Sequence, residues 1–157
     1  MRKLARSLRE KLLSESKIIL DTSFLLPYVG LRVKEVRTEI MNWLREIDQY
    51  YPYMMIPELV GVIIRVSRKM NVDSIPDQAL KGFNSIVYGD SIRLIEPMDE
   101  DLSIAYDLTR RGLRDIFDAI LYATSRRLGI KAITMDSSLV EFLKRNNFEA
   151  DNIILIT

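Results

Sequence analysis

The feature that most constrains the fold is the alternation of short apolar runs with longer amphipathic segments. Residues 18–20, Ile-Ile-Leu, form a run with no polar residue between the apolar ones. A strand of this kind must be covered on both faces, which is typical of a parallel sheet between two layers of helices. The sequence therefore predicts one α/β domain, a three-layer α/β/α sandwich with a central parallel sheet.

The expected strands and helices follow one another in a regular order. Apolar runs predict strands at 18–20, 53–56, 92–95, 131–135 and 153–156. Helical spacing predicts helices at 33–49, 57–70, 76–88, within 97–112, at 115–128 and at 138–145. A capping box formed by Ser138 and Glu141 is expected to start the last helix.

An extra amphipathic helix is expected ahead of the first strand. Residues 3–15 place Leu4, Leu8 and Leu12 on one helical face, with basic residues between them. We expect this face to pack on the body or on a second subunit. The sequence is thus divided into an N-terminal helix at 1–16 and an α/β domain at 17–157.

Composition excludes several kinds of chemistry. The 157 residues include no Cys and no His, so disulfides, thiolate sites, imidazole bases and nearly all zinc sites are excluded. Catalysis would need carboxylates, hydroxyls, amines or a hard metal ion. The formal net charge of +1 excludes a strongly basic surface overall, although residues 1–17 hold six Lys or Arg against two Glu. With neither a membrane span of about 18 apolar residues nor a signal peptide, we expect a cytoplasmic protein.

Four acids lie where strands end or helices begin. Asp21 and Asp136 follow predicted strands, Glu58 opens a helix, and Asp118 lies in the first turn of another. Ligands of a parallel sheet gather at the carboxyl ends of its strands, so we expect these acids to lie close together. Crowded carboxylates need a proton or a cation, and oxygen ligands alone select Mg²⁺ or Mn²⁺.

Each acid also has a structural interpretation when it is taken alone. Asp115 is best explained as a helix N-cap, and capping is an alternative for Asp118 and Asp136 as well. Asp21 is harder to explain in this way, because no helix is expected directly after it. Glu58 by itself is weakly specific. The order of the acids along the chain is more informative than any one of them.

Taken in order, these residues resemble the motifs of PIN-domain nucleases, especially the VapC-type toxins of prokaryotic toxin–antitoxin pairs. The segments "ILDTSFLL", "PELVGVI" and "DAILYATSRRLGIKAITMDSSL" carry the resemblance, which covers residues 17 to about 145. It implies a PIN-like fold and a metal-dependent endoribonuclease that hydrolyses RNA. The catalytic and metal-binding acids would be Asp21, Glu58, Asp118 and Asp136.

The resemblance also implies supporting residues and partners. Hydrogen bonds from Ser23 and Thr134 would support the acids, although Ser23 could equally bond its own backbone in a turn. The expected partners are RNA, a separate antitoxin chain and a second copy of the chain, with no membrane. The alternative is a non-catalytic PIN-like module used for binding or assembly.

Several residues near the acids have two interpretations. Arg114 is a candidate for binding a phosphate of the substrate. Arg110 and Arg111 could do the same, or could simply end a helix against its own dipole. Tyr122 and Phe24 could stack on bases, or could pack in the core.

Overall fold

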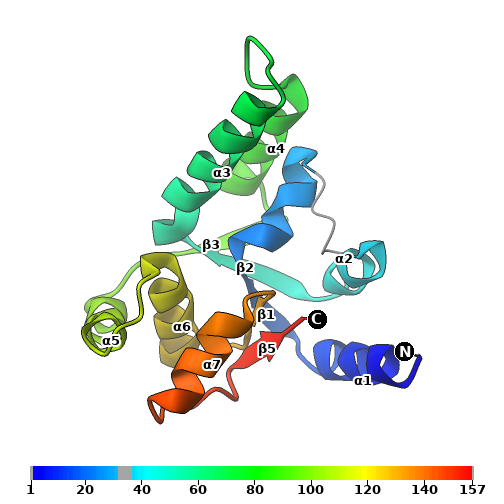
Figure 1. Cartoon of the computed structure of the whole chain (residues 1–157). Helices are drawn as coiled ribbons and strands as arrows, with labels where there is room; N and C mark the ends of the chain where they lie inside the picture. Colours follow the sequence, from blue (N-terminus) through cyan, green and yellow to red (C-terminus); the bar gives the residue numbers. More distant parts are fainter. Residues whose placement is uncertain (1, 32–36, 157) are drawn as a thin grey trace.

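The central sheet of this computed structural model, which describes residues 2–31 and 37–156, is entirely parallel (Figure 1). Within the described residues it has five strands in the order β3-β2-β1-β4-β5. The strands are β1 (Lys17–Leu20), β2 (Asp48–Pro52), β3 (Ile92–Ile95), β4 (Ala132–Thr134) and β5 (Ile153–Leu155).

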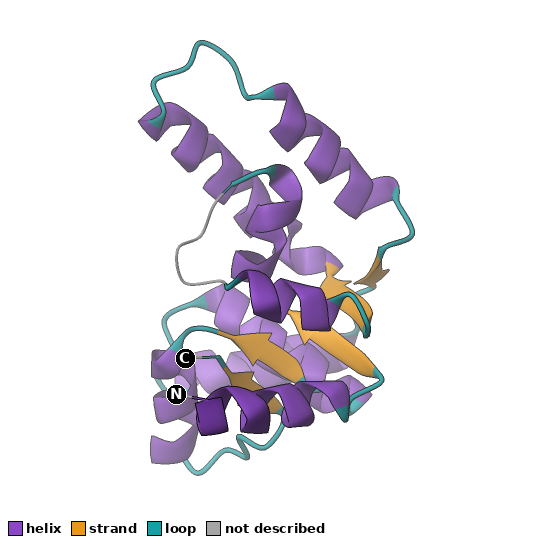
Figure 2. Ribbon diagram, turned by 90° about the vertical axis from the view of Figure 1, so that its right-hand side faces the viewer, coloured by secondary structure: helices purple, strands orange, loops and turns teal. Residues whose placement is uncertain are grey.

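Helices cover both faces of the sheet. Figures 1 and 2 show α1 and α2 on one face and α5 and α6 on the other. The α-helices of the described residues are α1 (Arg2–Leu13), α2 (Thr38–Leu44), α3 (Ile56–Lys69), α4 (Asp77–Tyr88), α5 (Asp99–Arg110), α6 (Ile116–Leu128) and α7 (Ser137–Arg145). The 3₁₀ helices are η1 (Thr22–Val29) and η2 (Tyr53–Met55). The predicted three-layer sandwich is confirmed. No helix of the described residues is long and apolar enough to cross a membrane.

The core explains why these segments form these elements. Ile18, Ile19 and Leu20 of β1 have no exposed surface, as expected for a central strand covered on both faces. Every residue of α6 from Ala119 to Ser125 is buried. The helix ends where Gly129 takes a left-handed conformation with φ 64°, which glycine adopts without strain. The strand that leads to Asp21 and the helix that carries Asp118 are therefore fixed by their own burial in the core.

The N-terminal helix packs on the body of the domain. Leu12 is completely buried and Leu8 packs against the core. An ion pair of 2.6 Å joins Lys131 Nζ to Glu15 Oε1 just after the helix. The side chain of Leu4 lies outside the described residues. The predicted packing of this face is confirmed for Leu8 and Leu12, while the division at residue 16 stays a prediction.

The second strand lies earlier than predicted. The strand expected at 53–56 is wrong: β2 ends at Pro52, and η2 follows it. The helix expected at 33–49 is α2, which spans only Thr38–Leu44, and residues 32–36 lie outside the described part of the chain. Gln49 of β2 is buried, and its Nε2 donates a 2.8 Å hydrogen bond to the carbonyl of Leu44, which removes the cost of burying this amide. The sequence pattern missed this strand because a polar residue, Gln49, occupies a buried position in it.

Helices α3 and α4 form a pair that projects beyond the sheet (Figures 1 and 2). The base of the pair is fixed where α4 packs on η1. Gly82 of α4 is buried there, and a Cβ on this residue would lie 2.2 Å from the carbonyl oxygen of Tyr28. Gly61 of α3 differs, because a Cβ there would meet nothing within 4 Å. Two glycines in adjacent helices therefore have opposite packing roles.

The two glycines provide a matched test of this packing. Gly61→Ala should stabilise the domain by about 0.5–1 kcal/mol, because alanine loses less backbone entropy in a helix. Gly82→Ala should destabilise it by about 1–3 kcal/mol, because η1 must move to admit the methyl group. Urea unfolding of both variants measures the difference. Equal effects of the two substitutions would contradict the described contact between α4 and η1.

Candidate functional site

Asp21 lies directly after β1, and hydrogen bonds hold both of its carboxylate oxygens. Oδ1 accepts a 2.7 Å bond from the backbone N–H of Thr22, which makes Asp21 the N-cap of η1. Oδ2 accepts a 2.8 Å bond from the hydroxyl of Thr134 at the end of β4. A helix does follow Asp21, contrary to the expectation from sequence. The supporting contact expected from Thr134 is present in the geometry.

Asp136 follows β4 and is connected to the same hydroxyl. Its backbone N–H donates a 3.0 Å hydrogen bond to Oγ1 of Thr134. Its Oδ1 accepts a 2.7 Å bond from the backbone N–H of Ser138, so Asp136 is the N-cap of α7. The capping box expected from Ser138 and Glu141 is therefore wrong by two residues. Asp136 remains exposed, so one carboxylate serves the helix and also faces solvent.

Glu58 lies in the first turn of α3 and contacts a buried hydroxyl pair. The hydroxyl of Thr22 donates a hydrogen bond to Glu58 Oε2. The same hydroxyl lies 2.9 Å from the hydroxyl of Tyr51, which donates a 2.7 Å bond to the carbonyl of Met55. Ser23 makes no hydrogen bond to an acid within the described residues. Its neighbour Thr22 makes the contact that was expected of Ser23.

The start of α6 contributes two acids. Asp115 is exposed and caps the helix, with Oδ1 accepting bonds of 2.8 Å and 3.4 Å from the N–H groups of Phe117 and Asp118. The N-cap expected at Asp115 is confirmed. Asp118 is half-buried, and across the described residues its carboxylate has no hydrogen-bond partner. It is thus the acid whose oxygens are left available to a ligand.

The pKa values of these acids record both burial and mutual repulsion. Burial raises the pKa of Asp118 to about 8, and repulsion from Asp115, Asp21, Asp136 and Glu58 adds to the effect. Burial raises the pKa of Glu58 to about 7, although the hydrogen bond from Thr22 opposes the shift. Burial also raises the pKa of Asp21 above its ordinary value. The four predicted acids, together with Asp115, therefore act on one another at one end of the sheet.

Sequence reasoning missed three contributors to this site. Thr22 and Tyr51 are uncharged, and only the fold brings them to Glu58. The only indication in the sequence that Thr22 belongs to the site was its position in the motif, directly after Asp21. Asp115 was treated as a cap alone, but it is the largest source of repulsion acting on Asp118 after burial. A carboxylate can cap a helix and still raise the pKa of its neighbours.

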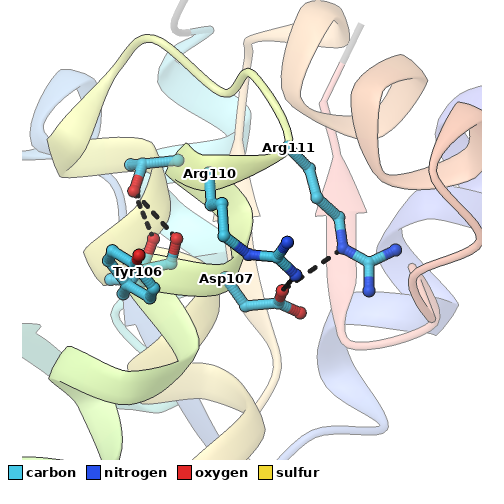
Figure 3. Close-up of polar contacts among 6 residues, drawn as sticks. Tyr106, Asp107, Arg110 and Arg111 are labelled. Atoms are coloured by element: carbon cyan, nitrogen blue, oxygen red, sulfur yellow. Dashed lines mark hydrogen bonds and ion pairs between the residues drawn. The ribbon is translucent and has the colours of Figure 1, made fainter.

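The other candidate residues fall into two groups. Arg114 is exposed beside Asp115, so it is available to a ligand. Phe24 and Tyr122 are buried in the core, which leaves neither free to stack on a base. Figure 3 shows Arg110 and Arg111 at the end of α5, where both contact Asp107 Oδ1, at 2.9 Å and 3.3 Å. These two arginines are neutralised locally, which favours the helix-end interpretation.

The donor set suits a hard divalent ion without forming a complete cage. Within the described residues, no three acids lie close enough together to hold an ion by themselves. Mg²⁺ is commonly held by one or two carboxylates, with water completing its shell. The free oxygens of Asp118 and the raised pKa values around it are what such an ion would relieve. The residues therefore fit Mg²⁺ or Mn²⁺ by donor type and by charge.

Comparisons with known proteins agree on the fold. The family model described as PIN domain matches residues 18–144. A toxin–antitoxin complex from Klebsiella pneumoniae has a similar chain, with a TM-score of 0.58 and 13% identity over 89% of this chain and 98% of that one. A crystal structure of a protein from Pyrobaculum aerophilum has a TM-score of 0.53 and 21% identity, over 80% of this chain and 78% of that one. No curated protein matches.

The uncompensated charge of Asp118 predicts how stability depends on pH without metal. The unfolded chain loses this proton near the ordinary pKa of 3.8, whereas the folded chain holds it to about 8. Between these two pKa values the folded state binds more protons than the unfolded state. The contribution of Asp118 to stability therefore falls as pH rises. Asp118→Asn should therefore melt higher than wild type in EDTA, by a margin that grows from pH 4 to pH 8. Each 1 kcal/mol gained in the free energy of unfolding should raise the melting temperature by about 2–4 °C.

The matched control is Asp107→Asn. The hydrogen bond from Arg110 lowers the pKa of Asp107, so its charge is favourable in the folded state. Removing that charge should leave the melting temperature unchanged or slightly lower at neutral pH. Melting curves of both variants in EDTA across the pH range compare the two. An Asp118→Asn variant that melts below wild type at pH 8 would contradict the described crowding of the acids.

Proposed function

Because the chain belongs to the PIN domain family, we propose that it is a metal-dependent endoribonuclease with Asp21, Glu58, Asp118 and Asp136 as its catalytic acids. One observation carries this proposal. The half-buried Asp118 carboxylate has a pKa of about 8 because of burial and four neighbouring acids, without a hydrogen-bond partner among the described residues. A site of this kind costs folding energy and so calls for a functional reason.

The proposed cofactor is Mg²⁺ or Mn²⁺, which one or two of the acids Asp118, Asp21, Glu58 and Asp136 would hold directly and the others through water. When bound, such an ion supplies positive charge that attracts a phosphodiester and makes water easier to deprotonate. The ordering of the acids comes from the protein itself. Thr134 fixes one oxygen of Asp21, and Thr22 fixes one oxygen of Glu58. Pre-oriented carboxylates of this kind need no rearrangement when a ligand arrives.

The chain offers one carboxylate in particular for proton transfer. Both oxygens of Asp21 accept hydrogen bonds, and one oxygen of Asp136 caps α7. The Asp118 carboxylate has no hydrogen-bond partner among the described residues. A carboxylate that is free in this way can take a proton from the attacking water. Arg114, exposed at the same helix start, is placed to bind a flanking phosphate.

The biological setting that we propose is a toxin–antitoxin pair. The sequence motifs resemble VapC-type toxins, and one structural neighbour belongs to a toxin–antitoxin complex. In this setting the chain would be the toxin, acting on RNA in the cytoplasm as a homodimer, with a separate antitoxin chain as its inhibitor. A non-catalytic PIN-like module for binding or assembly is the alternative that the experiments below would reveal.

Cleavage tests the catalytic assignment. Asp118→Asn and Asp136→Asn should each reduce Mn²⁺-dependent cleavage of a labelled RNA by about a hundredfold or more, because each removes a charge needed at the site. Asp136→Asn is informative because asparagine still caps a helix, so α7 should remain intact. EDTA should abolish cleavage by wild type. A polyacrylamide gel of the digestion products measures all three.

Asp115→Asn is the control for this experiment. Asp115 and Asp136 are both N-caps, and asparagine preserves both caps. Asp115→Asn should therefore keep most of the activity, while Asp136→Asn loses it. If Asp115→Asn were inactive and Asp118→Asn active, the assignment of the third acid would be reversed. A wild-type protein that binds RNA without cleaving it would support the binding module instead.

The toxin assignment has a separate test in cells. Expression of the wild-type chain in a bacterial host should stop growth, because cleavage of cellular RNA blocks translation. Asp21→Asn, expressed to the same level, should relieve the arrest, since it removes one of the four acids. Growth curves and immunoblots measure the two effects. Normal growth with an active wild-type enzyme would count against the toxin role and leave the nuclease proposal in place.

A further inference from the structure

A shallow depression runs along one face of α3, next to the acids. It is lined by Gly61, Ile64, Arg65, Arg68 and Lys69, all from this single helix. The helix starts beside the acids with Glu58 and runs outward into the projecting pair (Figure 1). The depression therefore begins about one helical turn after Glu58 on the same helix.

The basic residues of this depression differ from the ion-paired arginines of α5, α6 and α7. Arg65, Arg68 and Lys69 are exposed, and within the described residues none of them has an acidic partner in an ion pair. By contrast, arginines on α5, α6 and α7 each contact at least one acid: Arg110, Arg111, Arg126, Arg127 and Arg145. Three unpaired cations on one helical turn and a half form a strongly positive surface.

Helical geometry connects this surface to the acids. Arg65 follows Glu58 by two turns, about 10 Å along the axis, and so lies on the same side of α3. The charge of Arg65 lowers the pKa of Glu58, against the larger effect of burial. Arg68 and Lys69 continue the positive surface one turn further out. The sign of the surface thus changes from negative to positive along a single helix.

We propose that α3 guides an RNA strand away from the cleavage site, with Arg65, Arg68 and Lys69 binding its phosphates. This inference rests on the proposed function and specifies where the substrate runs. A polyanion with one phosphate at the acids must carry its next phosphates over some neighbouring surface. The unpaired cations of α3 supply that surface. Gly61 has no side chain, so it leaves room for the sugar–phosphate backbone of the RNA to approach the helix.

The features of the depression favour RNA over an acidic peptide. Its wall comes from one helix only, so a helical peptide would find no second side to pack against. The cations also follow Glu58 on the same side of α3, so they lie along the direction in which a substrate strand would leave the acids. Evenly charged single-stranded RNA gains from each cation along such a row, through release of counterions.

The test measures RNA binding without cleavage. In an Asp118→Asn background, the double variant Arg65→Gln with Arg68→Gln should bind a fluorescent single-stranded RNA about fivefold or more weakly at 0.1 M salt. The slope of log affinity against log salt should fall by about 1.4, because two phosphate contacts of a single strand are lost. Fluorescence anisotropy over a series of salt concentrations gives both values. The control is Arg110→Gln with Arg145→Gln, which has the same change in charge and should alter neither value.

Gly61 provides a second pair of variants that keeps the arginines. A side chain at this position meets nothing within 4 Å, so both variants should fold. Gly61→Glu should weaken RNA binding more than Gly61→Gln, which has nearly the same size without the charge. Equal binding by the two would show that charge on α3 does not matter. In that case the inference fails, even if the Arg65 and Arg68 double variant is weakened.

The outcomes separate this inference from the proposed function. If wild type cleaves RNA but the arginine pair leaves affinity and salt slope unchanged, the nuclease stands and the RNA path on α3 is overturned. If no variant cleaves but the arginine pair and Gly61→Glu lose RNA binding, the path stands without the nuclease. Unchanged RNA binding together with lost binding of poly-glutamate would assign the surface to an acidic protein partner instead.

Discussion

The pairing of β1 with β4 is the constraint on which the candidate site depends. These strands are neighbours in the sheet, with Leu20 beside Ile133, although more than a hundred residues separate them in the chain. The pairing brings the end of β1 to the buried hydroxyl of Thr134, which donates to Asp21 and accepts from the backbone of Asp136. One side chain therefore fixes the distance between the first and the last acid. Removing it would leave two partly buried polar groups without their partner, at a cost of about 1–3 kcal/mol each.

The charge distribution at the site opposes the stability that this pairing provides. Folding places five acids at the ends of β1 and β4 and the starts of α3 and α6, where burial and repulsion raise the pKa values of Asp118 and Glu58. Capping offsets part of this cost, because helix N-termini favour negative charge. Asp21, Asp115 and Asp136 all gain from that effect as N-caps. Asp118 and Glu58 lie in the first turns of their helices without capping them, and these two acids have their pKa values raised to about 8 and about 7.

Periodicity predicted the fold well where packing and pattern agree. The strand at 92–95 and the helix at 115–128, with its cap at Asp115, lie where the sequence placed them to within a residue. The second strand was misplaced because Gln49 and Tyr51 look polar in sequence and find partners only in the fold. The same limit applies to the site. Acids could be found by their position and motif, but the contact between Thr22 and Glu58 depends on two segments that only the folded chain brings together.

The hydroxyl chain behind Glu58 shows how these features combine at a single residue. Three contacts run from Glu58 to Thr22, from Thr22 to Tyr51 and from Tyr51 to the carbonyl of Met55. The two hydroxyls supply two protons, and Tyr51 uses its own on Met55. If Glu58 is ionised, the single proton of Thr22 can satisfy Glu58 or Tyr51 but not both. If Glu58 is protonated, it donates to Thr22, Thr22 donates to Tyr51, and every contact has its proton. This count favours the protonated acid, as burial does, and burial raises the pKa of Glu58 to about 7 although the hydrogen bond donated by Thr22 opposes the shift. The hydroxyl of Thr22 thus stabilises an ionised Glu58, while burial and the count of protons along the chain of hydroxyls favour the protonated acid.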